Sequence, residues 1–379
     1  MITINKKEDC CGCEACFQIC PQECISMIED SEGFIYPQIN NSKCIACNLC
    51  EKVCPIINKK EPYRPLKVYA AKNRNEEIRK TSSSGGIFTA IAENIIKQEG
   101  VVFGVSFDTN WNVVHSYTET IEGLSCFRGS KYVQSKIGDS YKLVRSYLKS
   151  GKIVLFTGTP CQISGLKNFL CKEYENLITI DILCHGVPSP QIWKKYLKEL
   201  KNKHEATNIK SVNFRDKKDG WSKFNLSIEF NNNKYYIEPF NKDIYFKGFL
   251  SNLYLRPSCY SCKTKNGRSG SDITIGDYWN INEASPEFND NKGISLVLIN
   301  TRKGENLYNH LNIDNKETNY EVCIPKNGGF NEKLKIPRKR KVFFKQINQK
   351  KRNLSQIIEN NLKVSLAGKL KKLIIKFIP

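Results

Sequence analysis

The sequence lacks an apolar run long enough to span a membrane, although 40% of its 379 residues are hydrophobic. The first residues, MITINKKEDCC, contain no apolar segment of the kind that directs secretion, so we expect a cytoplasmic protein. No G-x-G-x-x-G motif follows a predicted strand, and there is no Walker loop. Neither an NAD-binding Rossmann site nor an ATPase site is therefore indicated. A chain of this length suits two or three structural units.

Cysteine, in contrast, is abundant, with 17 residues in the chain. A reducing compartment disfavours disulfides, which leaves metal ligation, redox chemistry or simple burial as their roles. Ten of the 17 fall within residues 10–54. Core packing does not explain such a density, so this segment is predicted to bind metal.

Two cysteine runs in this segment share the spacing Cys-x2-Cys-x2-Cys-x3-Cys-Pro, one starting at Cys10 and the other at Cys44. This spacing holds cubane [4Fe–4S] clusters in bacterial two-cluster ferredoxins. Three thiolates bind three irons of one cluster, and the fourth reaches the other cluster. The pattern predicts one cluster bound by Cys10, Cys13, Cys16 and Cys54. It predicts a second bound by Cys44, Cys47, Cys50 and Cys20.

Zinc is the alternative metal for these thiolates, but zinc sites typically use two separated pairs rather than triples of cysteines. The Cys-x3-Cys-x2-Cys order of radical-SAM enzymes is absent. Cys11 and Cys24 fall outside the repeated pattern, and we interpret them as a bystander and as a packing residue. The sequence thus predicts a two-cluster ferredoxin module over residues 1–58, followed by the charged linker NKKEPYRP.

Apolar strands alternate with amphipathic helices after this linker. We expect strands at 66–72, 101–107, 152–158 and 177–184, and helices at 82–100, 139–151, 161–174 and 189–203. Beyond residue 205 the alternation is typical of half-buried strands. The expected fold combines α+β and α/β elements: a small bacterial-ferredoxin-like module fused to an α/β body over residues 66–330 with additional β-strands.

Four cysteines of this body are far apart in the sequence. Cys161 and Cys184 each follow a predicted strand, so both belong at the carboxyl edge of the sheet, where α/β proteins bind ligands. Cys259 and Cys262 form a Cys-x-x-Cys pair, which is half a metal site. Together the four could supply four thiolates, although a cysteine that ends an apolar strand is often only a small buried hydrophobe.

Two loops have the composition of an anion or cofactor site. TSSSGG, residues 81–86, precedes a predicted helix whose exposed N–H groups can receive a phosphate. An ordinary serine N-cap would explain the same residues. FRGSKYVQS, residues 127–135, offers a charge at Lys131, an aromatic ring at Tyr132 and an amide at Gln134.

Residues 66 to about 325 resemble the β-subunit family of coenzyme F420 hydrogenases and dehydrogenases. The resemblance rests on SSSGGIFTA, GSKYVQS, LFTGTPCQISGLK, DILCHGVPSP and CYSCKTKNGRSGSDITIGDYW. It implies an FAD beside the iron–sulfur clusters, in a flavin-binding body. It also implies a third [4Fe–4S] cluster on Cys161, Cys184, Cys259 and Cys262. The flavin contacts that it implies are Ser83, Ser84, Gly85, Gly86, Lys131, Tyr132, Gln134 and Ser135.

These expectations describe a flavin-dependent iron–sulfur oxidoreductase. A ferredoxin or another redox carrier would supply single electrons to the clusters, and FAD would exchange two electrons with a small-molecule or deazaflavin substrate. The use of F420 itself does not follow, because no F420 pocket is evident in the sequence. The alternative function is an electron-transfer subunit that feeds a partner enzyme.

Three residues of the body are weaker candidates. His185, beside Cys184, is the candidate catalytic residue because it could supply a proton, and the alternative is a structural role in its loop. Arg215 and Asp277 are open to two interpretations, as site residues or as surface ion-pair residues near turns. No role is assigned to Cys126, Cys171 and Cys323.

Positive charge is concentrated at the C-terminal end. Residues 331–379 contain fifteen Lys or Arg and two Glu, which is +13 of the net charge of +21. We expect this tail to be helical, with an amphipathic final segment, SLAGKLKKLIIKFIP. It could contact the inner face of an anionic membrane or an acidic protein, and a solvated lysine-rich surface is the alternative. We expect no nucleic-acid partner.

Overall fold

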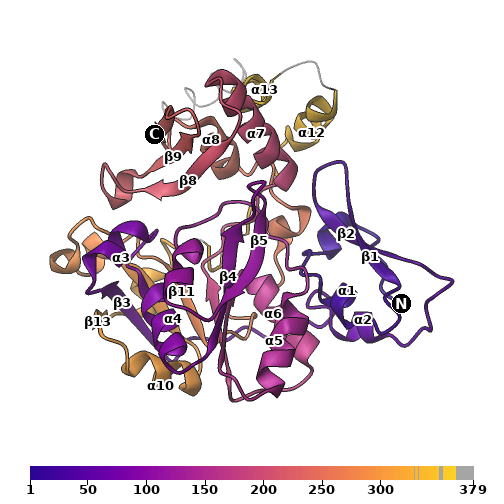
Figure 1. The fold of residues 1–379 in the computed structure, drawn as a ribbon, viewed down its shortest axis with the longest axis horizontal. Coiled ribbons are helices and arrows are strands. Elements are labelled where there is room, and N and C mark those ends of the chain that lie inside the picture. The colour runs from indigo at the N-terminus through magenta and orange to yellow at the C-terminus, as the bar shows by residue number, and fades with distance from the viewer. Residues whose placement is uncertain (328, 332, 350–352, 364–379) are drawn as a thin grey trace, which may run out of the picture.

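The computed structural model describes residues 1–379 except 328, 332, 350–352 and 364–379. The amphipathic segment 365–379 lies outside the described residues. Three parts are visible in Figure 1: an N-terminal module, a body around a large sheet, and a helical and β-stranded cap above the body. No helix in the described ranges combines the length and apolar character needed to cross a membrane.

The N-terminal module repeats its backbone as well as its sequence. It contains η1 (Lys7–Asp9), α1 (Ala15–Ile19), β1 (Ile25–Glu29), β2 (Ile35–Ile39) and α2 (Leu49–Lys52). The two strands form an antiparallel hairpin. Glu14 and Asn48 precede the two helices in the same left-handed conformation, with φ of 60° and 58°. Each helix thus starts at the same point of its cysteine run, as expected for a duplicated ferredoxin-like unit.

The body is built on an eight-stranded mixed sheet in the order β13-β3-β12-β11-β7-β6-β4-β5. Its strands are β3 (Lys67–Asn73), β4 (Val101–Phe107), β5 (Val113–Thr118), β6 (Val154–Gly158), β7 (Leu177–Ile182), β11 (Ile273–Asp277), β12 (Ser295–Ile299) and β13 (Ile313–Glu317). The four central strands β4, β6, β7 and β11 are parallel, and the outer strands are antiparallel. The expected α/β body is therefore present, with antiparallel strands at both edges.

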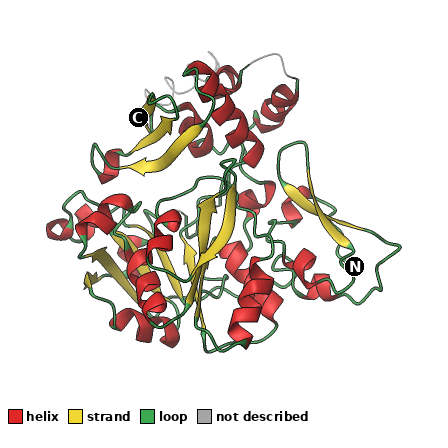
Figure 2. Ribbon diagram, in the orientation of Figure 1, coloured by secondary structure: helices red, strands yellow, loops and turns green. Residues whose placement is uncertain are grey.

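Helices cover both faces of this sheet, as Figure 2 shows. They are α3 (Glu76–Thr81), α4 (Ile87–Lys97), η2 (Glu122–Phe127), α5 (Ser140–Lys149), α6 (Pro160–Leu170), α9 (Ile281–Ala284), η5 (Pro286–Phe288), α10 (Arg302–Asn309) and α11 (Tyr320–Cys323). Val102 and Phe103, adjacent on β4, belong to separate cores on opposite faces. Burial on both faces explains why the central strands are almost continuously apolar.

The cap has its own core. It consists of α7 (Pro190–Lys203), β8 (Ile209–Asp216), η3 (Trp221–Lys223), β9 (Asn225–Phe230), β10 (Tyr235–Pro239), α8 (Ile244–Leu250), η4 (Pro257–Ser261), α12 (Arg340–Asn348) and α13 (Leu354–Leu362). The three strands form a separate antiparallel sheet. Phe343 of α12 and Ile358 of α13 are buried in the same core as Trp193 of α7. The described part of the basic C-terminal region thus contains two helices, α12 and α13, that pack on the cap.

Two side chains at the start of α1 and within it attach the module to the body. The carboxylate of Glu14 accepts hydrogen bonds from the backbone N–H groups of Ile137, at 2.7 Å, and Gly138, at 3.2 Å. The side-chain oxygen of Gln18 accepts from the N–H groups of Tyr141 and Lys142, in the first turn of α5. Side chains of the module therefore satisfy backbone donors that the body leaves unpaired at the start of this helix.

Replacing Glu14 by alanine should lower the free energy of unfolding by about 1–3 kcal/mol, because two backbone N–H groups lose their buried acceptor. Asn48→Ala is the matched control, since Asn48 has almost the same φ but its side chain accepts from the exposed N-terminal ammonium group. Denaturant unfolding of both variants measures the difference. Equal losses would contradict the proposed contribution of the contact between module and body.

Candidate functional site

The first cysteine set of the module faces the body. Cys13, Cys16 and Cys54 are buried, and Cys10 is half-buried. Burial raises the pKa of the Cys16 thiol, and the neighbouring thiols of Cys10 and Cys54 raise it further. Because charges act strongly only at short range, these thiols lie close together. The structure thus brings Cys54, from the second run, to the cysteines of the first run.

The second cysteine set lies at the outer end of the module. Cys20, Cys44, Cys47 and Cys50 line a hollow of about 20 Å³, together with Cys24 and the N-terminal methionine. The backbone N–H of Ile2 donates to the sulfur of Cys50 at 3.3 Å. Cys47 is exposed, so this set is the more accessible of the two. Cys24, interpreted as a packing residue, is buried with its sulfur 3.4 Å from that of Cys20.

The third set comes from three distant segments, two in the body and one in the cap. Cys161 lies in the first turn of α6, directly after β6, and Cys184 follows β7, the parallel neighbour of β6. Cys259 lies in η4 and Cys262 directly after it. The expectation that the first two meet at the carboxyl edge of the sheet is therefore confirmed.

The same structure brings the thiols of this third set together. Burial raises the pKa of Cys184 well above its ordinary value, and the thiols of Cys259, Cys161 and Cys262 add to the effect. Burial and the thiol of Cys262 likewise raise the pKa of Cys259 to about 12. The hydroxyl of Thr159 lies 3.2 Å from the sulfur of Cys161. The four thiols therefore lie near one another, and each of the four residues is half-buried.

Within the described residues, no three His, Cys, Asp or Glu side chains converge as ligands of a single metal ion would.

Cys11, interpreted as a bystander, is buried between two of the sets. A hydrogen bond with Cys13 and burial both raise its pKa, and a hydrogen bond with Cys161 opposes that rise. Cys11 thus lies where the first and third sets adjoin.

A cavity of about 760 Å³ opens beside the third set. Its floor is the carboxyl end of β6, β7 and β11, and its upper wall comes from the cap. The volume lies within the range of about 300–1,000 Å³ that is typical of small-molecule and cofactor sites. Cys184 belongs to the third thiol set and also lines this cavity. A group bound in the cavity would therefore adjoin the third set.

Most of the predicted flavin contacts line the cavity. They are Ser83, Ser84, Gly86, Lys131, Tyr132 and Ser135. Gly86 is the N-cap of α4, with φ of 80°, so the first N–H groups of this helix lie at the cavity. The hydroxyls of Ser83 and Ser84 bind Ser130 and the carbonyl of Ile294, respectively, and thereby hold the loop in place.

Two predicted flavin contacts lie elsewhere. Gly85 does not line the cavity: its N–H donates to the hydroxyl of Ser295, and a Cβ there would collide with the carbonyl oxygen of Ala71. The amide of Gln134 points to the module, where it donates to the carbonyl of Cys11 at 3.1 Å. One loop therefore contributes Lys131 and Tyr132 to the cavity and Gln134 to the contact with the module.

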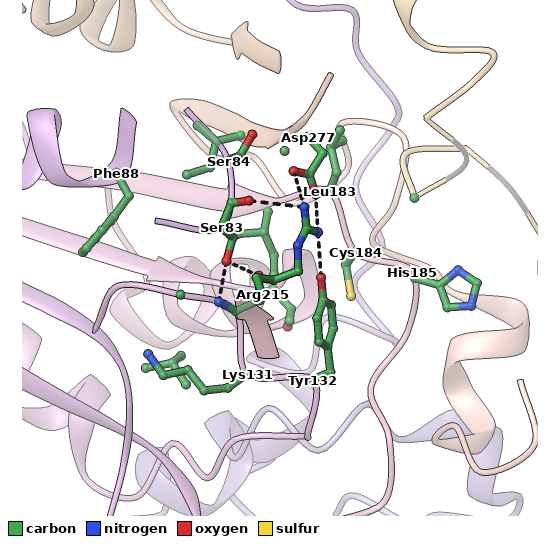
Figure 3. A pocket seen from close by; sticks show the side chains of 18 of the residues that line it. Ser83, Ser84, Phe88, Lys131, Tyr132, Leu183, Cys184, His185, Arg215 and Asp277 are labelled. Atoms are coloured by element: carbon green, nitrogen blue, oxygen red, sulfur yellow. Dashed lines mark hydrogen bonds and ion pairs between the residues drawn. The ribbon is translucent and has the colours of Figure 1, made fainter. Parts of the chain in front are cut away.

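His185 lines the cavity, but its ring is held by other contacts. Its Nε2 lies 2.6 Å from the side-chain oxygen of Asn252, and its ring meets Phe249 edge-on at 5.3 Å. Figure 3 shows the ring apart from the contacts at the centre of the cavity. These contacts support a structural role for His185, in which the ring holds its loop in place.

Arg215 and Asp277 form a buried ion pair in the cavity wall, not a surface pair. The guanidinium donates to both carboxylate oxygens, at 2.9 and 3.0 Å. It also donates to the hydroxyl of Tyr132 and the carbonyl of Ser83, as Figure 3 shows. The residues end β8 and β11, two strands of different sheets. Their opposite charges are visible in the sequence, but their pairing depends on how the cap sits on the body.

Two features of the wall indicate an anionic or hydrogen-bonding ligand. Nε of Arg215 is buried and, among the described residues, has no hydrogen-bond partner. Burial lowers the pKa of Lys131 to about 8, although its ammonium donates to the carbonyls of Cys126 and Arg128. A buried donor without a partner is costly unless a ligand compensates for it, and the half-buried ammonium of Lys131 adds a positive charge to the wall.

Three family models match segments of the chain. Residues 9–56 match the model of the 4Fe-4S dicluster domain. Residues 68–140 match the N-terminal part, and residues 151–321 the C-terminal part, of the coenzyme F420 hydrogenase/dehydrogenase beta subunit. Together these two parts cover more than half of the chain.

Two relatives can be described. A polyferredoxin-like protein of Methanocaldococcus jannaschii is 33% identical over 73 residues, which are 16% of this chain and 44% of that protein. The chain therefore spans less than half of this curated relative. One chain of the F420-reducing [NiFe] hydrogenase complex of Methanosarcina barkeri aligns with a TM-score of 0.49 and 17% identity, covering 78% of this chain and 98% of that chain.

The fold and the site define an iron–sulfur protein in which a 4Fe–4S-binding module is fused to a mixed α/β body with a large cavity. The chain belongs to the family of coenzyme F420 hydrogenase and dehydrogenase beta subunits. This family comprises subunits of oxidoreductases.

If the third thiol set binds a cubane cluster, Cys161→Ser should reduce the iron content of the reconstituted protein from about twelve to about eight atoms per chain, four fewer. Cys323→Ser is the control, because Cys323 is a wholly buried cysteine that lies in another core, beside Tyr320. Anaerobic reconstitution and iron analysis provide the measurement. About eight irons in the unaltered protein would exclude a third cluster.

Proposed function

We propose that this chain is an iron–sulfur flavoprotein oxidoreductase, which moves electrons between a one-electron carrier and a two-electron partner at FAD. The observation that carries the proposal is the position of Cys184, which belongs to a group of four half-buried thiols and lines a cofactor-sized cavity. Electrons delivered to that group would arrive at the wall of the cavity without crossing solvent.

The proposed path of the electrons passes through the three cysteine sets. The exposed second set, with Cys47 at the surface, is the entry point for a soluble carrier such as a ferredoxin. The first set lies between it and the body, and Cys11 adjoins the third set. Twelve cysteines would therefore bind three [4Fe–4S] clusters in series: Cys10, Cys13, Cys16 and Cys54; Cys20, Cys44, Cys47 and Cys50; and Cys161, Cys184, Cys259 and Cys262.

The cavity residues suit FAD in several ways. The first turn of α4 presents backbone N–H groups to a phosphate, and Lys131 offers a positive charge. Arg215 offers its unpaired Nε–H to a ligand oxygen. Phe88, Phe246 and Phe249 supply apolar surface for a planar ring. Bound FAD would supply the exchange between single electrons and a hydride-type transfer.

The cavity also has a side on which a second molecule can dock. Trp279 lines it, is 45% exposed, and stacks on Trp221 with ring centroids 5.2 Å apart. A small-molecule or deazaflavin substrate would reach FAD from this side. If the chain is instead an electron-transfer subunit, a partner enzyme would cover the same side of the cavity.

An anaerobic reduction assay tests the proposed function. The protein is reconstituted with iron, sulfide and FAD, and flavin bleaching is followed with reduced ferredoxin, NAD(P)H or reduced F420 as donor. The proposal predicts retained FAD that at least one donor bleaches. Failure to retain FAD after reconstitution would contradict it, whereas FAD that bleaches only with a partner enzyme present would favour the transfer subunit.

Arg215→Met should weaken FAD binding by about 10–100-fold, because one charged hydrogen bond is worth about 1.5–3 kcal/mol. Arg340→Met is the control, since Arg340 is also buried and paired with a carboxylate but does not line the cavity. Flavin titration followed by fluorescence quenching measures both affinities, and iron content verifies that the clusters are intact. Equal affinities in the two variants would exclude Arg215 as a ligand contact.

A further inference from the structure

A second buried arginine, Arg256, lies where the module meets the body. Its side chain is wholly buried, and it directly precedes η4, which carries Cys259. Its Nε donates to the carbonyl of Cys10 at 2.8 Å, and its Nη2 donates to the carbonyl of Ile35 at 2.9 Å. Nη2 also lies 3.5 Å from the sulfur of Cys10. The body thus places a guanidinium directly against a predicted cluster ligand.

The remaining contacts of this guanidinium are neutral. Nη1 donates to the side-chain oxygen of Gln134 at 3.0 Å, and the cation lies 4.5 Å from the ring centre of Tyr36. No carboxylate in the described part of the chain lies within ion-pairing distance of Arg256. Burial raises the pKa of Glu14, and the charge of Arg256 opposes that rise. Both carboxylate oxygens of Glu14, however, accept hydrogen bonds from backbone N–H groups.

A buried cation without a carboxylate partner needs another source of negative charge. Arg215 has Asp277 and Arg340 has Glu32, so Arg256 differs from the other two buried arginines in this part of the molecule. The sulfur of Cys10, 3.5 Å from Nη2 of Arg256, is the group in contact with this guanidinium that becomes negative when it binds a cluster. Four thiolates around a [4Fe–4S] core leave the cluster with a net negative charge, which would balance the guanidinium.

The surrounding backbone is shaped to admit this side chain. Gly12, between Cys11 and Cys13, has φ of 69°, and a Cβ there would stand 2.7 Å from Nη1 of Arg256 and 2.8 Å from the amide nitrogen of Gln134. Glycine is suited to both the left-handed conformation and the close approach. The cysteine loop therefore packs directly against Arg256 and Gln134, and position 12 has no room for a side chain.

We propose that Arg256 is the counter-ion of the cluster bound by Cys10, Cys13, Cys16 and Cys54, and that it raises the reduction potential of that cluster. The inference rests on the proposed function, because it requires the cluster. Reduction adds an electron to a group that is already negative, so an adjacent fixed cation favours the reduced state. Arg256 is thus a positioning residue that tunes the step between the module and the body.

Redox titration of the reconstituted protein, followed by electron paramagnetic resonance, tests this inference. The Cys10 cluster is assigned as the signal that changes in Cys16→Ser. Arg256→Gln should shift the potential of that cluster to a more negative value, because the charge is lost. Arg256→Lys should largely restore it, because a cation is kept. No shift in Arg256→Gln, with the cluster loaded, would overturn the inference.

A second variant covers the case in which Arg256→Gln fails to load the cluster. Gln134→Glu keeps the size of the side chain and places a carboxylate on Nη1 of Arg256, so it should neutralise the cation and shift the same potential in the same direction. An unchanged or more positive potential in this variant would also overturn the inference.

The control is the double variant Arg340→Gln, Glu32→Gln. Arg340 joins the same hairpin of the module to the body through Glu32, at 2.9 and 2.6 Å, but contacts no cysteine. If loosening of the module alone shifts the potential, this control will shift equally, and the inference fails. Absence of any cluster signal in the unaltered protein would instead refute the proposed function, so the two failures are distinguishable.

Discussion

The arrangement of the site depends on the contact between the N-terminal module and the body. The first cysteine run takes part through the side chains of Glu14 and Gln18 and the loop around Cys11, and Val53 of the second run packs in the same core. Gly165 of α6 is needed for this approach, because a Cβ there would stand 2.9 Å from Cys13. The contact places the buried thiols of the module next to Cys161 and leaves the second set accessible from outside.

The same contact makes one loop serve two sites. In residues 129–137, Lys131 and Tyr132 face the cavity, whereas Gln134 faces the cysteine loop of the module and Ile137 donates to Glu14. Arg215 holds Tyr132 from the cap side, and Arg256 holds Gln134 from the module side. Two buried cations, one at the cavity and one at the thiols, are therefore joined by a short, well-anchored segment.

Local sequence patterns predict much of this structure. The strands and helices of the first half of the body follow from apolar periodicity and capping residues such as Thr159 and Gln162, which form a capping box on α6. The positions of Cys161 and Cys184 follow from a general rule about parallel strands. The repeated cysteine spacing is by itself sufficient to identify a 4Fe–4S-binding module.

The remaining features depend on contacts between distant segments, which periodicity does not encode. The Arg215–Asp277 pair joins strands of two sheets, and the sequence leaves open whether these are surface residues. Gln134 is expected at the flavin, but its amide binds the carbonyl of Cys11 and the guanidinium of Arg256 instead. The helices α12 and α13 pack in the cap core through Phe343 and Ile358, a contact that their basic composition obscures.

The central claim is a continuous path for electrons from the module to the cavity, and rapid-mixing kinetics tests it most directly. In the reconstituted protein, a reduced ferredoxin should bleach the bound flavin. In Cys259→Ser, the account predicts that FAD is still bound and is still reduced by a hydride donor that bleaches the unaltered protein, while reduction by ferredoxin becomes slower by orders of magnitude. Equal rates of reduction by ferredoxin in the two proteins would contradict the account.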